Sequence, residues 1–414
     1  MNIERTFHRI AFAVIALMSG IVPGKASAES SITVDGVAQR WPWNNKLDIT
    51  YTVSGGQNVE AGVFAKVEFT ATIDGVTYDI DGSCIGANAS NGTHVATWTI
   101  PAGLRAKGCT MSAALRSSNV PSGNDYMVID LATGDVMYEG LLATQEASNT
   151  RYADDVYKTD KLLLRKVAGG REYKVGDWRD ETHKSRMWSV GRDFYIGVYP
   201  VTQYQYQKLC GSNPSNFKTQ ISGNEIHLRP VENVSWDDLR VKGTAPASPI
   251  PASDSADSGT FFQRLNHKTG LYFDLPTEVM FEISERAKDD NVSSTYFWGS
   301  DKSLGVNYCV CSENSSGSTV AVGSHSPNDW GIYDTAGNVW EWCLDDDSLV
   351  KLWEGIDALV PACASGVNRR LRGGGPYNQS VFNQEVNFRT STRYQAVPEK
   401  QSSVFGFRVS YVTK

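Results

Sequence analysis

The cysteines and histidines are the side chains of this sequence that are best suited to redox or metal chemistry. Cys309-Val310-Cys311 has a spacing that could chelate a soft metal ion. The number of cysteines, seven, is odd, so outside the cytosol at least one thiol stays free, pairs between chains or binds a ligand. The histidines are scattered, and no two stand at metal-ligand spacing. The cysteines are at positions 84, 109, 210, 309, 311, 343 and 363, and the histidines at 8, 94, 183, 227, 267 and 325.

Most of these cysteines are expected to form disulfide bonds. Cys343 and Cys363 bracket an insertion, and a bond that closes a loop of this length stabilises by about 3 kcal/mol. Cys84 and Cys109 could link two parts of the N-terminal region, although sequence cannot show that their Cβ atoms face each other. One of Cys309 and Cys311 is expected to pair with Cys210, which leaves the other as the free thiol.

Composition indicates a folded, acidic protein. The chain has 414 residues, of which 41% are hydrophobic and 21% charged, a length that suits two or three domains. The net charge is −7, and no basic region remains to follow a phosphate backbone. Nucleic acid is therefore excluded as an expected partner.

The first 28 residues have the pattern of a secretory signal peptide. Arg5 and Arg9 precede an apolar run over residues 10–18, and Ala26-Ser27-Ala28 forms a cleavage site before Glu29. The run is too short for a membrane anchor, and no later stretch is long enough, so no transmembrane segment is expected. We expect a secreted or periplasmic protein that is cleaved near Ala28, in which disulfide bonds are permitted.

Residues 31–164 have the period-two pattern of β-strands. Hydrophobic residues alternate with polar ones over residues 47–53 and 67–73, and the second run ends at Asp74-Gly75, a favoured hairpin pair. Evenly spaced strands between turns predict an antiparallel, immunoglobulin-like β-sandwich.

Residues 165–414 have a different character. Helical spacing occurs in Thr202–Leu209, Phe261–Asn266 and Thr277–Ala287. Long loops rich in Gly, Ser, Asn and Asp separate these segments, and such loops in a compact domain are usually functional or held by metal, disulfide or close packing. This pattern predicts an α+β domain with little regular structure.

Short strings with recognisable residue patterns follow one another through this second region. They are Phe194-Tyr195-Ile196-Gly197, Val201-Thr202-Gln203-Tyr204, Asn213-Pro214-Ser215-Asn216-Phe217, Arg229-Pro230-Val231-Glu232-Asn233-Val234-Ser235-Trp236, Leu275-Pro276-Thr277-Glu278, Phe297-Trp298-Gly299, Gly331-Ile332-Tyr333-Asp334, Gly337-Asn338-Val339-Trp340-Glu341-Trp342, Leu371-Arg372-Gly373-Gly374 and Phe405-Gly406-Phe407-Arg408. This ordered series resembles the formylglycine-generating enzyme, or sulfatase-modifying factor, family. The resemblance covers about residues 165–412 and implies a C-type-lectin-like fold.

The family's copper site is not expected in this chain. In relatives that oxidise a sulfatase cysteine, two cysteines shortly after the Arg-Gly-Gly string bind copper. Counting forward from the glycines puts Asn378 and Asn383 at these positions, and counting back from Arg389 and Arg393 puts Ser380 and Glu385 there. Neither register supplies a thiolate, so copper-dependent oxidation should be absent and we assign no catalytic residue. A related branch holds iron with histidines on an added helical domain, which this chain does not have.

The resemblance does imply structural calcium. Carried over from the family, the ligands of one site are Asp334, Gly337, Val339 and Glu341, with side-chain oxygens at the ends and carbonyls between them. A second site would begin at Asn307 and the Tyr308 carbonyl, with Glu313 or Asn314 as candidates for its carboxylate position. The alternative is that Asp334 caps a turn and Glu341 pairs with an arginine. The run Asp345-Asp346-Asp347 is expected to be solvated and is assigned no site.

The segment that would carry the copper ligands instead has the residue types of a recognition surface. Amides donate and accept hydrogen bonds, and aromatic rings supply contact area at low entropy cost, so we expect a peptide or glycan ligand. Alternatively, Phe382 and Phe388 are core residues, and Arg389 and Arg393 brace the fold through buried carboxylates. The expected ligand-binding residues are Tyr377, Asn378, Asn383, Asn387, Arg389 and Arg393.

Three functions are consistent with this sequence. The first is an exported binding module that has lost copper-dependent oxidation. The second is an oxidoreductase of the same superfamily with a non-standard active site, with Cys309 or Cys311 as candidates. The third is a structural component of a surface assembly.

Overall fold

The computed structural model describes most of the chain, in two units. The first unit comprises residues 1–124 and 135–142, and the second comprises residues 125–134 and 143–414. The expected signal peptide lies outside the described residues, as does Cys363. The described residues are 31–39, 46–54, 64–73, 75–80, 84–85, 92–100, 109–118, 124–140, 153–177, 185–218, 225–251, 258–288, 293–347, 357–361 and 367–413.

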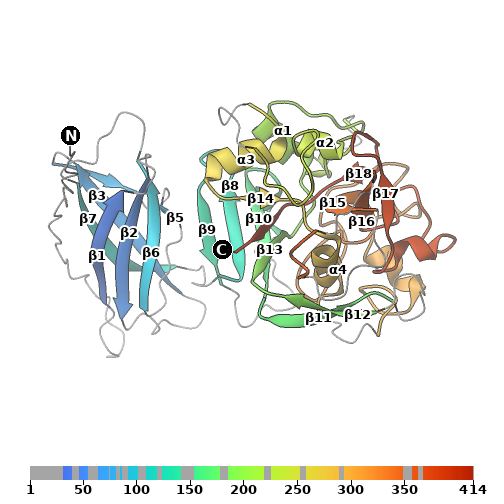
Figure 1. Ribbon diagram of the computed structural model, residues 1–414, viewed down its shortest axis with the longest axis horizontal. Coiled ribbons are helices and arrows are strands. Elements are labelled where there is room, and N and C mark those ends of the chain that lie inside the picture. The colour runs from blue at the N-terminus through green and yellow to red at the C-terminus, as the bar shows by residue number, and fades with distance from the viewer. Residues whose placement is uncertain are drawn as a thin grey trace, which may run out of the picture. The chain divides into compact units, whose positions relative to one another are not determined.

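The first unit consists of β-strands in two antiparallel sheets (Figure 1). One sheet has the order β1-β2-β6-β5 and the other β4-β3-β7. Alternate residues of both sheets, among them Ile49, Phe69 and Trp98, form one hydrophobic cluster, as the period-two pattern predicts. The strands of these sheets are β1 (Ser31–Gln39), β2 (Lys46–Ser54), β3 (Phe64–Ile73), β4 (Val76–Asp79), β5 (Cys84–Ile85), β6 (Gly92–Thr99) and β7 (Thr110–Ser118). A further strand, β9 (Val136–Glu139), lies within the residues of the first unit but belongs to neither of these sheets.

The boundary between the units lies earlier in the chain than we expected from the sequence. The expected boundary at residue 164 falls inside β10 (Lys161–Val167), which pairs with β8 (Tyr126–Asp130) on one side and β13 (Phe194–Gly197) on the other. Strands β8 and β10 therefore belong to the central sheet of the second unit. A period-two pattern marks them as strands but does not say which sheet they join.

The second unit mixes short helices with short strands, which confirms the α+β class (Figure 1). Its central sheet contains the neighbours β14-β19-β13-β10-β8, and a separate sheet has the order β17-β16-β15-β18. Its strands are β8, β10, β11 (Arg171–Val175), β12 (Arg186–Val190), β13, β14 (Phe273–Asp274), β15 (Trp340–Asp346), β16 (Arg369–Arg372), β17 (Tyr394–Ala396), β18 (Phe405–Gly406) and β19 (Ser410–Val412). Its helices are α1 (Gln203–Cys210), α2 (Trp236–Leu239), α3 (Phe261–Thr269), α4 (Glu278–Arg286) and the 3₁₀ turns η3 (Asp155–Lys158), η4 (Glu225–Leu228), η5 (Lys302–Asn307) and η6 (Glu385–Phe388).

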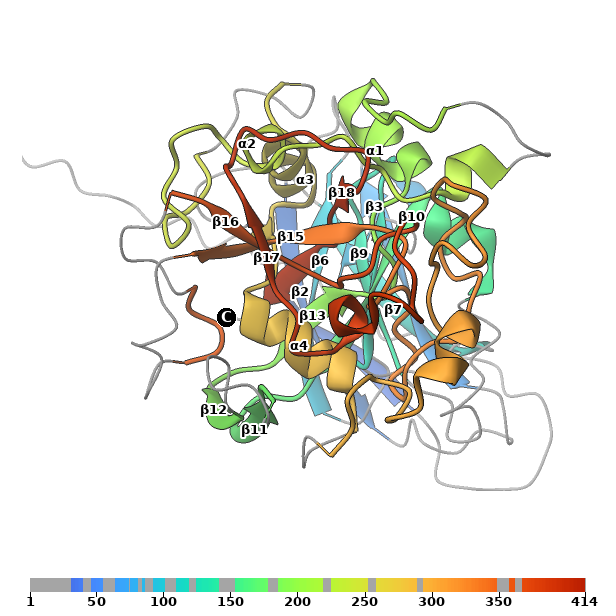
Figure 2. The same cartoon turned by 90° about the vertical axis from the view of Figure 1, so that its right-hand side faces the viewer.

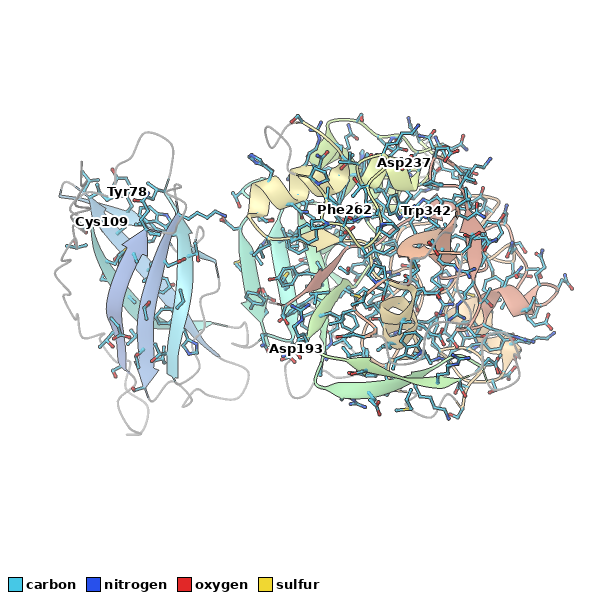
Figure 3. The ribbon with its side chains drawn as sticks, in the orientation of Figure 1. Tyr78, Cys109, Asp193, Asp237, Phe262 and Trp342 are labelled. Carbon is cyan, nitrogen blue, oxygen red and sulfur yellow. The ribbon has the colours of Figure 1, made fainter. Side chains whose placement is uncertain are left out.

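Local signals explain where the helices begin and end. Thr202 caps α1 in a capping box with Gln205, and Gly211 ends the helix in the left-handed conformation. Thr277 caps α4 by accepting a hydrogen bond from the Met280 amide. The helices expected from the sequence are confirmed as α1, α3 and α4. Large side chains such as Phe262 and Trp342 fill the interior between helices and sheets (Figure 3).

The cysteines described by the structure carry free thiols. Cys210, Cys309 and Cys311 are all unpaired, so the expected bond from Cys210 to one of the other two is wrong. The Cys210 thiol lies at the end of α1, where it contacts Tyr206, whereas the Cys309 thiol donates to the Gly305 carbonyl. Cys109 and Cys343 are also free, and their expected partners, the Cys84 side chain and Cys363, lie outside the described residues. Among the described residues, no helix has the length and apolar character needed to cross a membrane.

Candidate functional site

The segment that follows β16 packs directly onto a glycine turn. A Cβ atom at Gly374 would lie 2.0 Å from the Asn387 carbonyl oxygen, and one at Gly375 would lie 2.2 Å from the Phe388 ring. Phe388 is 1% exposed and fills the space beside these glycines. Position 375 therefore requires glycine for two reasons. A side chain there would overlap the Phe388 ring, and the backbone has a φ of +68°, which favours glycine.

We predict that Gly375→Ala destabilises the second unit by about 2–4 kcal/mol, through left-handed strain and overlap with Phe388. Gly317→Ala is the matched control, since Gly317 has a φ of +77° but nothing within 4 Å of its virtual Cβ atom. The control should lose only about 1–2 kcal/mol in urea unfolding. Equal losses in the two variants would show that Phe388 does not occupy this space.

The predicted ligand-binding residues separate into internal and surface positions. Tyr377 is buried, with its ring edge-on to Phe217 and its hydroxyl 3.3 Å from that of Ser403. Arg393 is also internal, because it pairs with Glu278 at 3.0 Å and with Glu282 at 3.4 Å. These two side chains stabilise the fold, as the alternative interpretation held for Arg393.

The other four predicted residues lie at or near the surface. Asn378 and Asn383 are exposed, and Asn387 and Arg389 are half-buried. The Arg389 Nε is inaccessible and has no hydrogen-bond partner among the described residues. Exposed apolar side chains lie on the same segment: Phe382 at 40%, Val386 at 50% and Tyr394 at 48%. We refer to Asn378, Phe382, Asn383, Val386, Asn387 and Tyr394 as the loop surface. Val386 did not stand out in the sequence, because a lone valine in a polar loop resembles a core residue.

A buried charge cluster holds this segment on the rest of the unit. Glu282 of α4 contacts Arg286 at 2.9 Å and Arg372 at 2.6 Å, and Arg372 also donates to the Thr390 and Thr392 carbonyls. Burial by itself would raise the pKa of Glu282, but the arginines outweigh it and lower that pKa to about 2. Sequence analysis missed this cluster because charged residues in an amphipathic helix usually face solvent.

The expected calcium loop has an arginine at its centre. Glu341 accepts hydrogen bonds from Arg408 at both carboxylate oxygens, at 2.6 and 2.7 Å, and Arg408 also donates to the Asp334 carbonyl. The Asp334 carboxylate accepts from the Gly323 amide, while the Gly337 carbonyl accepts from the amide of Val339. This is the arginine pairing that we kept as the alternative. Among the described residues, no three His, Cys, Asp or Glu side chains form a metal-binding group, so calcium at this loop stays a prediction.

The expected second calcium position is arranged around an amide. Asn314 Nδ2 donates to the carbonyls of Val306 and Cys309, and Asn314 Oδ1 accepts from the Cys311 amide. Asn307 is exposed, and the Tyr308 side chain is half-buried beside it. Of the two candidates for the carboxylate position, Asn314 thus closes this loop with hydrogen bonds, and the Glu313 carboxylate accepts from the Ser380 hydroxyl and the Val381 amide.

Two free thiols lie beneath the loop surface. Cys309 and Cys311 are fully buried and pack in one cluster with Val381 and Phe388. Their thiols contact each other, and this contact together with burial raises the pKa of Cys309 well above its ordinary range. The Cys309 thiol is therefore protonated at neutral pH, the form in which a thiol is a poor nucleophile and a poor metal ligand.

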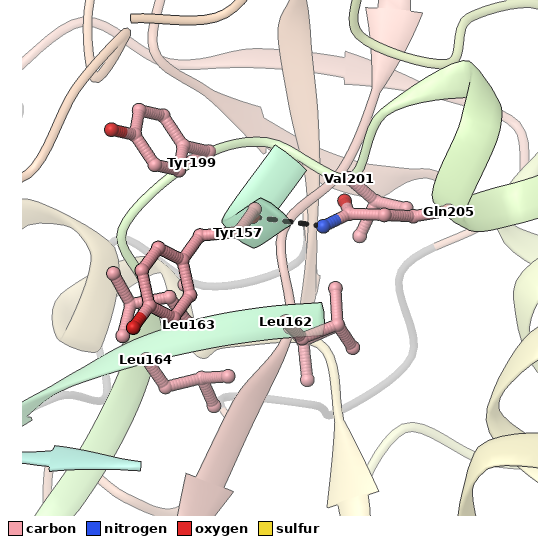
Figure 4. Close-up of a pocket in the computed structure, with 9 residues that line it drawn as sticks. Tyr157, Leu162, Leu163, Leu164, Tyr199, Val201 and Gln205 are labelled. Carbon is pink, nitrogen blue, oxygen red and sulfur yellow. Dashed lines mark hydrogen bonds between the residues drawn. The ribbon is translucent and has the colours of Figure 1, made fainter. Parts of the chain in front are cut away.

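A small cavity lies between α1 and β10, but it cannot hold a ligand. Its volume of about 10 Å³ has room for about one water molecule. Leucines of β10, together with Tyr157 and Tyr199, line it, and Gln205 donates to the Tyr157 carbonyl across one end (Figure 4).

Comparison with known proteins identifies the family of the second unit. Residues 159–411, well over half of the chain, match the family described as "Sulfatase-modifying factor enzyme 1-like domain". The chain belongs to this family. The resemblance seen in the ordered strings is thereby confirmed. We refer to residues 375–389, where the family's copper ligands would lie, as the copper segment, and neither register of it contains a cysteine.

Two curated relatives and one solved structure are similar to the second unit. The "Chaperone protein LppX" of Paenibacillus barcinonensis is 30% identical over 234 residues, which cover 50% of this chain and 76% of the relative. The formylglycine-generating enzyme of Streptomyces coelicolor is 28% identical over 207 residues, 47% of this chain and 56% of that enzyme. The structure of Treponema denticola variable protein 1 has a TM-score of 0.51 at 24% identity and covers 61% of this chain and 96% of its own, a likeness of fold.

Proposed function

We propose that the second unit is a binding module for a peptide and that it has lost the copper-dependent oxidation of its family. The main support is that neither register of the copper segment contains a cysteine, combined with the packing of Phe388 onto Gly375. A redox metal at the surface there would have only amide, hydroxyl or carboxylate donors, which do not select Cu(I). The relative named as a chaperone supports a peptide ligand, since a chaperone binds polypeptide.

The loop surface supplies both parts of a peptide site. Asn378, Asn383 and Asn387 carry amides that match the alternating donors and acceptors of a peptide backbone. Phe382, Val386 and Tyr394 offer apolar area for side chains, and Tyr394 is held from behind by the Trp340 ring at 5.3 Å. The half-buried Arg389 would favour an acidic residue in the ligand.

The first test separates binding from oxidation. The full chain is loaded with copper and given a cysteine-containing sulfatase peptide, while oxygen uptake and conversion of the cysteine are measured. We expect no turnover, because neither register of the copper segment contains a cysteine, and Cys309 and Cys311 are fully buried. Turnover at a rate proportional to bound copper would refute the proposal.

The second test locates the peptide. A peptide array is probed with the full chain, and the strongest peptide is titrated against Phe382→Ser and Tyr394→Ala. Each variant should weaken binding by about 1–2 kcal/mol, or roughly fivefold to thirtyfold, because aromatic anchors dominate such interfaces. Met187→Ala is the matched control, since Met187 of β12 is 56% exposed and lies outside the loop surface. Equal affinities in all three variants would contradict this location.

One observation favours a second candidate, an oxidoreductase that uses Cys309 and Cys311. Both thiols are free and lie under Val381 and Phe388, close to the copper segment of the family. Their complete burial and the raised pKa of Cys309 oppose this function. Oxygen uptake that disappears in Cys309→Ser but not in Cys210→Ser would establish it in place of the binding module.

We further infer that the N-terminal segment directs export, that the first unit is immunoglobulin-like and that the second unit is C-type-lectin-like. We also infer that residues 334–341 hold a structural calcium ion. The two sheets with a shared cluster support the inference for the first unit. N-terminal sequencing of protein made with its leader should begin at Glu29.

Calorimetric titration with calcium should give one saturable site, and Asp334→Asn should weaken binding at it. Absence of binding heat would refute calcium binding at residues 334–341.

A further inference from the structure

A second, polar hollow shares no lining residue with the loop surface. It has a volume of about 700 Å³, within the size range of small-molecule sites. Its wall is formed by η5 with the residue that follows it and by the loop from Gly323 to Tyr333, which lie on the side of the second unit that faces the viewer in Figure 2. The lining residues are Leu304, Val306, Asn307, Tyr308, Gly323, Ser324, His325, Ser326, Pro327 and Tyr333.

Two aromatic rings of the wall are held in place from behind. Tyr333 stacks on the buried Tyr199 ring at 5.0 Å with 23° between the planes. Tyr308 stacks on Trp298 at 5.8 Å and 9°, and Trp298 in turn stacks on the buried Tyr296 at 4.7 Å and 2°. Rings that are already ordered lose little entropy when a ligand packs on them.

The remaining wall offers hydrogen-bonding groups. Asn307, Ser324 and Ser326 are exposed at the rim. His325 lies deeper, with Nε2 at 3.1 Å from Asn314 Nδ2. The Nδ1 atom is inaccessible and has no hydrogen-bond partner among the described residues.

The wall carries no fixed charge. None of its lining residues is an aspartate, glutamate, lysine or arginine. The nearby Asp334 carboxylate is buried and already accepts from the Gly323 amide. An ionic ligand would therefore find no counter-charge here.

We propose that this hollow binds a neutral saccharide. A pyranose ring has a flat C–H face that packs on a tyrosine ring and hydroxyl groups around its edge that pair with serine and asparagine groups. The volume, the two braced rings, the polar rim and the lack of charge together match this chemistry. The site is independent of the peptide site, because it uses none of the residues of the loop surface.

The test uses the full chain and three neutral probes: cellotriose, maltotriose and triacetylchitotriose. Each is titrated by calorimetry and by ligand-observed NMR. We expect saturable binding of at least one trisaccharide at millimolar concentration. Tyr308→Ala should raise its Kd by about threefold to tenfold through the lost ring contact. Ser326→Trp should abolish binding, since a bulky side chain on the exposed Ser326 would fill the hollow.

Controls separate this site from the peptide site. Tyr394→Ala removes an exposed ring of the loop surface and should leave the saccharide Kd unchanged while it weakens peptide binding. Thermal unfolding of each variant checks that it is folded. If Tyr308→Ala does not fold, Ser326→Trp still tests whether the saccharide binds in this hollow. The proposal is overturned if no trisaccharide binds, if binding is insensitive to Ser326→Trp, or if Ser326→Trp abolishes peptide binding instead.

Discussion

Replacing Arg408 with leucine is expected to cost the second unit about 3–5 kcal/mol of its free energy of unfolding, a large part of the roughly 5–15 kcal/mol that is typical of a folded domain. Arg408 is fully buried and donates to both oxygens of Glu341 and to the carbonyls of Gly197, Tyr333 and Asp334. Leucine would leave an uncompensated carboxylate and three carbonyls without their donor. Urea unfolding followed by tryptophan fluorescence measures the loss.

Two controls separate loss of the charge pair from loss of packing. Arg408→Leu combined with Glu341→Leu should be more stable than Arg408→Leu alone, because no buried charge is left unpaired. Lys166→Met removes the partly exposed pair with Asp193 at 2.8 Å and should cost less than about 1 kcal/mol. If Arg408→Leu costs no more than Lys166→Met, the central role of Arg408 is wrong. A calcium-dependent rescue of Arg408→Leu would support an ion at this loop.

Glu285→Gln is expected to stabilise the second unit at high pH and to have little effect at pH 5. Glu285 is 2% exposed, and burial raises its pKa from 4.5 to about 8. A raised carboxyl pKa means that the folded state holds the proton more tightly than the unfolded state does. The resulting stability is complete below pH 4.5 and is lost as the pH rises to about 8. The neutral amide of glutamine removes this dependence, with a gain on the order of 3–5 kcal/mol at pH 9.

The check is the unfolding free energy of both proteins between pH 5 and pH 9. Glu282→Gln gives the opposite control, since the pKa of Glu282 is lowered to about 2 and its charged form is stabilised by three arginines. That variant should be less stable than the wild type throughout this range. Parallel pH profiles of the wild type and Glu285→Gln would show that Glu285 is already charged in the folded state at neutral pH.

The proposed function depends on the missing cysteines of the copper segment and on the packing beneath that segment. The missing cysteines at the copper positions can be seen in the sequence alone, under either register. The packing of Phe388 against Gly375 and the burial of Cys309 and Cys311 come from the tertiary structure. Together they argue for recognition instead of oxidation on a scaffold that belongs to an oxidase-containing family.

The sequence by itself determined the features that depend on near neighbours in the chain. The ordered strings identified the family, and helical spacing of residues predicted α1, α3 and α4. The hairpin expected at Asp74-Gly75 is found between β3 and β4, where Ile73 pairs with Val76 and Gly75 has a φ of +77°. Such signals are readable because hydrogen bonds and backbone conformation within one turn involve only a few adjacent residues.

Only the tertiary structure decided which distant residues meet. It assigned β8 and β10 to the second unit, paired Glu341 with Arg408 and buried Glu282 among arginines from three segments. It also moved Tyr377 and Arg393 from the expected binding surface into the interior and brought Tyr308 and Tyr333 to one hollow. The physical reason is that charge pairing and burial depend on separation in space, and residue types along a chain do not specify that separation.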